Sequence, residues 1–217
     1  MNTISNLWLR TKRSALDFIR NRSGVAAVEF AFIAPLMLVM LFGVVEVSDA
    51  IAVQRKTTLV ARTLSDLTSR WQATVAPMNA MLDADLRNVF TASVGIVAPY
   101  KATPVKATIT EILVNANGVA KVVWSKSATI ASGATQATLA TSSRAPGDTV
   151  TSTVPSQILV PQTYLIFAEV EYQYKSMVGK FIPFPGIKLG DKAYSRPRAF
   201  TCIVYGGLPA GNVCPLT

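Results

Sequence analysis

The chain has 217 residues, 50% of them hydrophobic, a formal net charge of +9 and a mean hydropathy of +0.36. These values lie between those of a soluble domain and those of a polytopic membrane protein, so they indicate one membrane segment and one domain. Much of the charge lies near the start of the chain, because five basic residues and one acid occupy the first 22 positions. Without residues 1–24 the net charge falls to +5, which weakens a nucleic-acid-binding interpretation.

The segment from Gly24 to Val45 is apolar over 22 residues and contains one charged side chain, Glu29. As a helix it would be roughly 33 Å long, enough to cross a hydrocarbon core of about 30 Å. The basic residues before it predict a cytoplasmic N-terminus and a translocated remainder. Inside the span, Pro35 removes one helical hydrogen bond and predicts a bend.

A cleaved secretory signal is the alternative for this segment. Its apolar core usually has only about 7 to 15 residues, which fits less well. The alternative stays open, because Ala50-Ile51-Ala52 has the small-x-small form that signal peptidase prefers. Cleavage there would release a soluble domain that begins at Val53.

Glu29 is unusual because a charged side chain at mid-bilayer costs on the order of 2.5 to 3.5 kcal/mol. Either it lies shallow enough to reach water, or a cation compensates it. The surrounding residues, Arg22-Ser23-Gly24 followed by Val25-Ala26-Ala27-Val28-Glu29-Phe30, resemble the processing site of type IV prepilins.

That resemblance implies that a prepilin peptidase cuts between Gly24 and Val25. The cut would create an α-amino group, with a reference pKa of about 7.7 to 8.0, at the edge of the hydrocarbon. Glu29 of one subunit could then neutralise the amino terminus of its neighbour and set the register of assembly. Glu29 and Phe30 are therefore the predicted subunit-assembly residues.

The resemblance continues past the processing site. Pro35 and the sequence Phe42-Gly43-Val44-Val45-Glu46 are similar to the TadE/TadG-like pseudopilins of the tight-adherence (Tad/Flp) pilus system. Further on, Tyr194-Ser195-Arg196-Pro197-Arg198 resembles an Arg-Pro-Arg element near the end of these proteins. Arg196 and Arg198 are thus candidates for an interaction, although a solvated edge strand explains them equally well.

The resemblance implies a function in assembly. A TadE-like minor pilin is a single-pass protein of the bacterial inner membrane with a periplasmic domain. Its partners would be the prepilin peptidase, other pilins and pseudopilins, the assembly platform and the lipid bilayer, and the process would be adhesion and biofilm formation. The competing hypothesis is an uncleaved signal anchor that carries a periplasmic binding or sensory module.

The helical pattern continues beyond the span at 25–46, because residues three and four apart remain apolar up to Trp71. This predicts a continuation of the helix over 47–72, followed by a periplasmic α+β domain over 73–217. Pro77 opens a second helical pattern, in which Asp83 and Arg87 are spaced for an ion pair.

Alternation with a period of two predicts strands after Pro104 and over 163–175, and Asn115–Gly118 predicts a hairpin turn between strands. A last strand is expected near Tyr194–Tyr205, where Pro197 argues for an edge or a bulge. Residues 127–157 are rich in Ser, Thr and Ala and are expected to form a mobile loop.

Phe181–Ile187 is a hydrophobic segment that either caps the core or is exposed. The predicted fold class is α+β: a long N-terminal membrane-spanning helix packed on a small antiparallel sheet, as in pilins.

Cys202 and Cys214 lie in the final segment, and the predicted orientation places them in an oxidising compartment. A structural disulfide is the expected outcome, worth up to about 3 kcal/mol for a loop of this length. Thiol chemistry is the alternative, but the spacing is not that of a C-x-x-C motif.

The sequence contains no histidine. This excludes Ser-His and Cys-His nucleophile pairs and zinc sites that use histidine. Glu169 and Glu171 lie two apart on a predicted strand and need no catalytic role. We therefore expect no enzyme activity, no cofactor and no metal.

Overall fold

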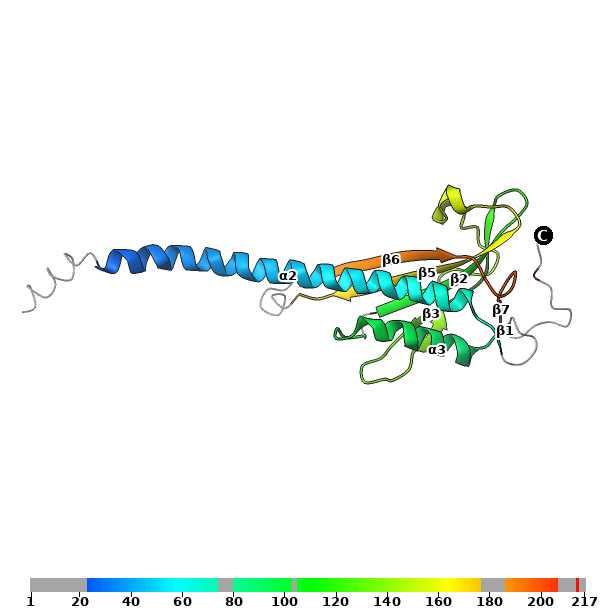
Figure 1. The fold of residues 1–217 in the computed structure, drawn as a ribbon, viewed down its shortest axis with the longest axis horizontal. Coiled ribbons are helices and arrows are strands. Elements are labelled where there is room, and N and C mark those ends of the chain that lie inside the picture. Colours follow the sequence, from blue (N-terminus) through cyan, green and yellow to red (C-terminus); the bar gives the residue numbers. More distant parts are fainter. Residues whose placement is uncertain (1–22, 74–79, 103–104, 177–185, 207–213, 215–217) are drawn as a thin grey trace, which may run out of the picture. The chain divides into compact units, whose positions relative to one another are not determined.

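The chain forms two compact units, Met1–Ser48 and Asp49–Thr217. Figure 1 shows the helices and strands with their labels. The computed structural model describes residues 23–73, 80–102, 105–176, 186–206 and 214.

Three predicted features lie outside the described residues. These are the basic leader up to Arg22, the start of the second helical pattern at Pro77, and most of the hydrophobic segment Phe181–Ile187.

Helix α2 covers Ser23–Ser69 and contains both the apolar segment and its predicted continuation. In the second unit one stripe of this helix is buried, and Val53, Val60 and Leu64 have no exposed surface. Their spacing places them on one face of the helix, which explains why this face packs on a sheet. Leu67, three residues further along the helix, is 37% exposed and marks the edge of the stripe.

The second unit is built on a five-stranded sheet with the order β4-β3-β2-β5-β6. All four neighbouring pairs are antiparallel. Together with the long N-terminal helix, the sheet confirms the predicted α+β class. The strands are β2 (Val105–Val114), β3 (Ala120–Thr129), β4 (Thr138–Thr141), β5 (Thr163–Tyr174) and β6 (Ile187–Ser195).

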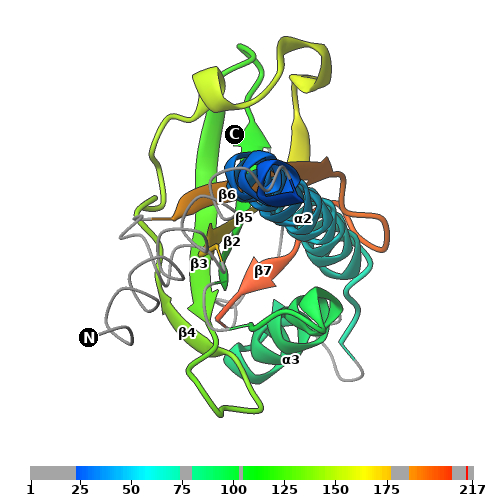
Figure 2. The same ribbon diagram turned by 90° about the vertical axis from the view of Figure 1, so that its left-hand side faces the viewer.

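One face of this sheet is covered by the second-unit part of α2 and by α3, Asp83–Val94. Figure 2 shows both helices on the same side of the strands. Leu64 of α2 and Phe90 of α3 join Ile109 of β2 in one buried cluster. A 3₁₀ turn, η1 (Gly95–Val97), follows α3 directly.

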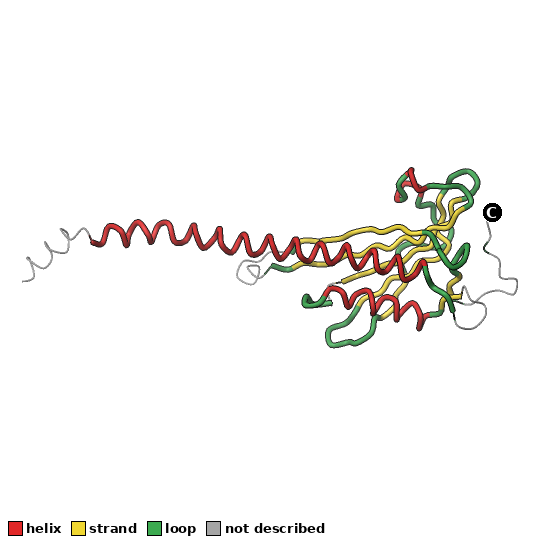
Figure 3. Tube along the Cα trace, in the orientation of Figure 1, coloured by secondary structure: helices red, strands yellow, loops and turns green. Residues whose placement is uncertain are grey.

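The other face carries a second cluster, in which Leu165 and Phe167 of β5 pack with Val150 and Val154. These two valines lie in the segment 127–157 that was expected to be a mobile loop. The segment is not structureless: it includes the end of β3, the strand β4, the 3₁₀ turn η2 (Thr151–Thr153) and most of the 3₁₀ turn η3 (Ser156–Ile158). Figure 3 shows the strands and loops of this region.

Composition alone led to the expectation of a loop because large apolar groups are rare there. The structure shows that the segment contributes buried side chains to both clusters, Ala128, Ile130 and Ala137 to the first and Val150 and Val154 to the second. Polar contacts add to this attachment. The Tyr194 hydroxyl donates a hydrogen bond to the Thr153 carbonyl over 2.7 Å, and Arg144 forms an ion pair with Glu169 over 2.8 Å.

The strand β5 and the hairpin turn at Asn115–Gly118 lie where they were predicted. The continuous last strand near Tyr194–Tyr205 was wrong. Strand β6 ends at Ser195, and β7 (Val204–Tyr205) pairs in parallel with β1 (Ala80–Met81) in a separate two-stranded sheet. Pro197 lies in the gap between the two strands, where a residue without an N–H does not interrupt a ladder.

Candidate functional site

The bond predicted to be cut, between Gly24 and Val25, lies within helix α2. Among the described residues, a Cβ added at Gly24 would meet no atom of another part of the chain within 4 Å. Packing against these residues therefore does not require a glycine. Its conformational freedom would suit the extended backbone of a peptidase substrate, and this role stays a prediction.

The side chains of the residues that follow are exposed. Glu29 is exposed, and Phe30 is 67% exposed. Both are therefore accessible to lipid or to a neighbouring subunit. They are members of a continuous exposed surface whose large apolar side chains are at least half exposed: Val25, Val28, Phe30, Phe32, Ile33, Leu36, Met37, Leu38, Val39, Met40, Leu41, Phe42, Val44, Val45 and Val47.

Such a surface is unfavourable in water, because burying one large aliphatic or aromatic side chain is worth about 1.5 to 3 kcal/mol. The helix is long and apolar enough to cross a membrane, and none of its apolar window is buried by the protein. One N-terminal apolar helix of this kind fits a single-pass membrane anchor. Pro35 lies inside α2, which continues through it; the bend at this proline stays a prediction.

The two arginines of the Arg-Pro-Arg element have different surroundings. Arg198 forms an ion pair with Asp66 of α2 over 3.2 Å, and its backbone N–H donates to the Ser69 carbonyl over 2.7 Å. Arg196 is exposed. The element thus attaches the chain after β6 to the end of α2, while Arg196 remains a candidate for interaction.

The predicted bond between Cys202 and Cys214 is present. Cys202 is buried beside Leu113 of β2 and Tyr164 of β5. The disulfide therefore links the C-terminal segment to the sheet, as a structural bridge would.

Next to the disulfide lies a buried acid that sequence reasoning did not single out. Glu111 has no exposed surface. Its carboxyl group accepts hydrogen bonds from Trp124 Nε1 over 2.8 Å and from the Ile203 backbone N–H over 2.7 Å. Burial raises the pKa of Glu111 to about 8, although both hydrogen bonds oppose the shift. The signal that could have found it is an acid within a strand that is otherwise rich in β-branched and apolar residues.

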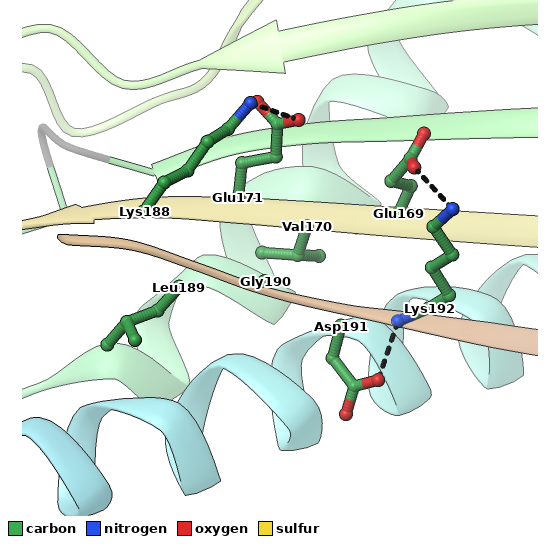
Figure 4. A pocket seen from close by; sticks show the side chains of 8 residues that line it. All are labelled: Glu169, Val170, Glu171, Lys188, Leu189, Gly190, Asp191 and Lys192. Atoms are coloured by element: carbon green, nitrogen blue, oxygen red, sulfur yellow. Dashed lines mark hydrogen bonds and ion pairs between the residues drawn. The ribbon is translucent and has the colours of Figure 1, made fainter.

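The described residues also form a pocket with a largely charged lining along β5 and β6, shown in Figure 4. Lys188 pairs with Glu171 over 2.8 Å, and Lys192 pairs with Glu169 over 3.3 Å. Burial alone would raise the pKa of Glu169, but the hydrogen bond and charge of Arg144 and the charge of Lys192 lower it. The lowered pKa of Glu169 makes it part of an ion-pair cluster rather than a proton donor.

A long apolar helix that the described residues leave uncovered, followed by an α+β unit with a C-terminal disulfide, fits the class of proteins with a single membrane anchor. Residues 24–64 match the family model of TadE-like proteins. The predicted resemblance to TadE-like proteins of the Tad pilus is thus confirmed for this part of the chain. No curated protein and no solved structure matches the chain.

Proposed function

We propose that this chain is a pseudopilin of a Tad-type adhesion pilus. A prepilin peptidase cuts it after Gly24, and the mature subunit remains in the bacterial inner membrane by its apolar helix. The domain that follows lies in the periplasm. The role is structural rather than enzymatic, and the partners are other pilins, pseudopilins and the assembly platform.

One observation carries the proposal. The TadE-like match begins at residue 24, the position at which the prepilin-type motif places the cut, and the uncovered apolar surface lies directly after it. An uncleaved signal anchor accounts for that apolar surface, but it gives no reason for a glycine before it and a glutamate five residues later.

The proposal assigns a task to each part of this segment. Gly24 is the last residue of the leader, and Val25 becomes the new amino terminus. Glu29 neutralises the α-amino group of a neighbouring subunit, because two charges at the edge of the hydrocarbon cost less together than apart. Phe30 packs beside that pair.

The experiment compares Gly24→Ala with Gly43→Ala in cells. Both glycines lie in α2 with no atom within 4 Å of an added Cβ, so neither substitution disturbs packing within the chain. We expect Gly24→Ala to accumulate as the longer precursor and to reduce pilus number, whereas Gly43→Ala is processed normally. Normal processing of Gly24→Ala would contradict the assigned cleavage site. Normal pili in cells that contain only the precursor would contradict the role of cleavage in assembly.

A further inference from the structure

Several elements of the second unit end close together at the end where α2 enters this unit. Lys56 of α2 donates through Nζ to the Ile96 carbonyl of η1 over 3.0 Å. The start of β2 lies beside the end of β5, because Val105 pairs with Tyr172. The end of β5 in turn lies beside the start of β6. Figure 1 shows these element ends at one end of the unit.

This end carries an excess of cations. We call its exposed basic side chains the cationic rim, and each comes from a different element or connection of the unit. Lys188, beside the rim, is neutralised by Glu171 over 2.8 Å. Among the described residues, no ion pair is found for the members of the rim, which are Arg55, Lys101, Lys106 and Lys175.

The acids at the same end do not balance these charges. Glu171 is the register partner of Lys106 on the neighbouring strand, but its carboxylate bonds to Lys188. Two further acids, Asp49 at the start of the unit and Asp191 within β6, are outnumbered by the four rim cations. The rim therefore keeps a net positive charge.

Amphipathic and apolar groups accompany the rim. Tyr100 is half-buried next to Lys101, and Ile187 at the start of β6 is 47% exposed. A tyrosine and an exposed aliphatic side chain among cations are typical of protein surfaces that meet a membrane interface.

The chain itself limits how far the rim lies from lipid. Ten residues separate Val45, the last residue of the apolar segment, from Arg55, a distance of about 15 Å along a helix. The headgroups occupy roughly 5 to 8 Å of that distance. Arg55 is then within about one Debye length of the headgroup charges at physiological salt. Basic residues near an anionic bilayer surface contribute on the order of 1 kcal/mol each.

We propose that the cationic rim docks on anionic phospholipid headgroups of the membrane that holds the anchor. This contact would hold the second unit against the bilayer surface until the subunit is taken up into an assembly. The inference rests on the membrane anchor, and it does not depend on cleavage after Gly24 or on a pilus.

The test labels the lysines of the full-length chain in nanodiscs with a water-soluble acylating reagent and measures each site by mass spectrometry. One set of discs contains only phosphatidylcholine, and the other contains phosphatidylglycerol in addition. Lys121 is the internal reference, because it is exposed and lies near the start of β3 at the other end of the sheet. We expect labelling of Lys101, Lys106 and Lys175 relative to Lys121 to be roughly threefold slower in the anionic discs. The difference should disappear at about 0.5 M salt, where the Debye length is about 4 Å.

A pair of matched variants separates the rim from general charge. Arg55→Gln with Lys175→Gln removes two rim cations, and we expect Lys101 and Lys106 to lose most of their protection. Arg87→Gln with Arg196→Gln removes two exposed cations elsewhere in the unit and should leave the protection unchanged.

Two results would overturn the proposal. The first is an equal labelling ratio of the rim lysines to Lys121 in both kinds of disc, which would mean no cover or steric cover without charge. The second is an equal loss of protection in the two variants. A chain that does not enter the discs at all would contradict the anchor instead, and with it the docking.

Discussion

The carboxyl group of Glu111 lies where β2 has an irregularity in its pairing with β3, between Glu111 and Ile112. Its two hydrogen-bond donors come from different parts of the chain, the indole of Trp124 and the backbone of Ile203. Trp124 also donates to the Ile203 carbonyl over 2.7 Å. This small network fixes the C-terminal segment on the sheet, and with a pKa of about 8 for Glu111 it does so without a buried charge at neutral pH.

The raised pKa of Glu111 predicts a pH dependence of stability. The folded-state value is about 8 and the ordinary value is 4.5, so the folded protein binds the proton more tightly than the unfolded chain. Below pH 4.5 Glu111 is protonated in both the folded and the unfolded state, so it does not change the free energy of unfolding. Above that pH the free energy of unfolding falls as pH rises, and the loss is complete above pH 8. The total loss is about 1.4 kcal/mol for each unit of difference between the two pKa values. Denaturant unfolding in detergent at several pH values measures this slope.

The matched variant is Glu111→Gln, which keeps the shape of the side chain but cannot ionise. We expect it to be less stable than the wild type at pH 5 by about 1 to 3 kcal/mol, because its amide NH₂ faces a hydrogen-bond donor. Its stability should change little between pH 5 and 8. Equal slopes for both proteins would show that Glu111 is not the group that titrates.

Substitution of Glu29 tests its proposed role as a counter-charge. In Glu29→Ala the α-amino group of a neighbour loses its proposed counter-charge, so we expect normal cleavage after Gly24 with strongly reduced pili or subunit association. Val28→Ala is the control, because it shortens an adjacent exposed side chain without removing a charge. Crosslinking and pilus counts measure the effect, and wild-type pili from Glu29→Ala would rule out the neutralising role.

Two leucines of α2 differ in exposure, and their substitution tests how this helix packs on the sheet. Leu64 has no exposed surface, whereas Leu67 is 37% exposed. We expect Leu64→Ala to lower the free energy of unfolding of the second unit by about 2 to 5 kcal/mol, because it leaves a cavity between helix and sheet. Leu67→Ala should cost roughly 1 kcal/mol or less. Equal losses in denaturant unfolding would contradict the packing of this face.

The C-terminal segment allows another test. Replacing both cysteines, Cys202→Ala with Cys214→Ala, removes the covalent link between this segment and a residue that is buried against the sheet. We expect a loss of up to about 3 kcal/mol. The wild type should lose a similar amount on reduction, while the double variant should not respond to a reductant. A wild type whose unfolding midpoint is insensitive to reductant would show that the bridge contributes nothing to stability.

Local patterns predicted some elements well and others badly. Strand β5 alternates large apolar and polar residues, and the hairpin before β3 contains Asn-Gly, so both could be located from sequence. Strand β6 was not expected, because it contains Gly190 and several charged residues. It exists because its backbone pairs along β5, which is a tertiary effect that local propensity does not contain.

The burial of polar side chains could not be predicted from local sequence patterns either. Thr110 occupies a polar position in the alternating sequence after Pro104, yet it is fully buried in β2. Its hydroxyl is hydrogen-bonded to that of Ser125 over 2.7 Å. The environment of Glu111 likewise depends on Ile203, 92 residues further along the chain. No window of a few residues can reveal such a contact.

For the whole molecule, the apolar segment was the most predictable part, because the thickness of a bilayer sets its length and requires an unbroken apolar surface. The candidate site lies in the same segment, so the local sequence was sufficient to propose Gly24, Val25, Glu29 and Phe30. Their roles involve a peptidase and a neighbouring subunit. Neither can be derived from the packing of a single chain.

The intact mass of the protein extracted from the membranes of its native cells tests directly whether it is a processed pseudopilin. We expect a mature amino terminus at Val25 in the membrane fraction, and the full precursor in cells without a prepilin peptidase. An intact terminus at Met1 in wild-type cells would contradict the pseudopilin and favour an uncleaved anchor. A soluble product that begins at Val53 would contradict the anchor as well.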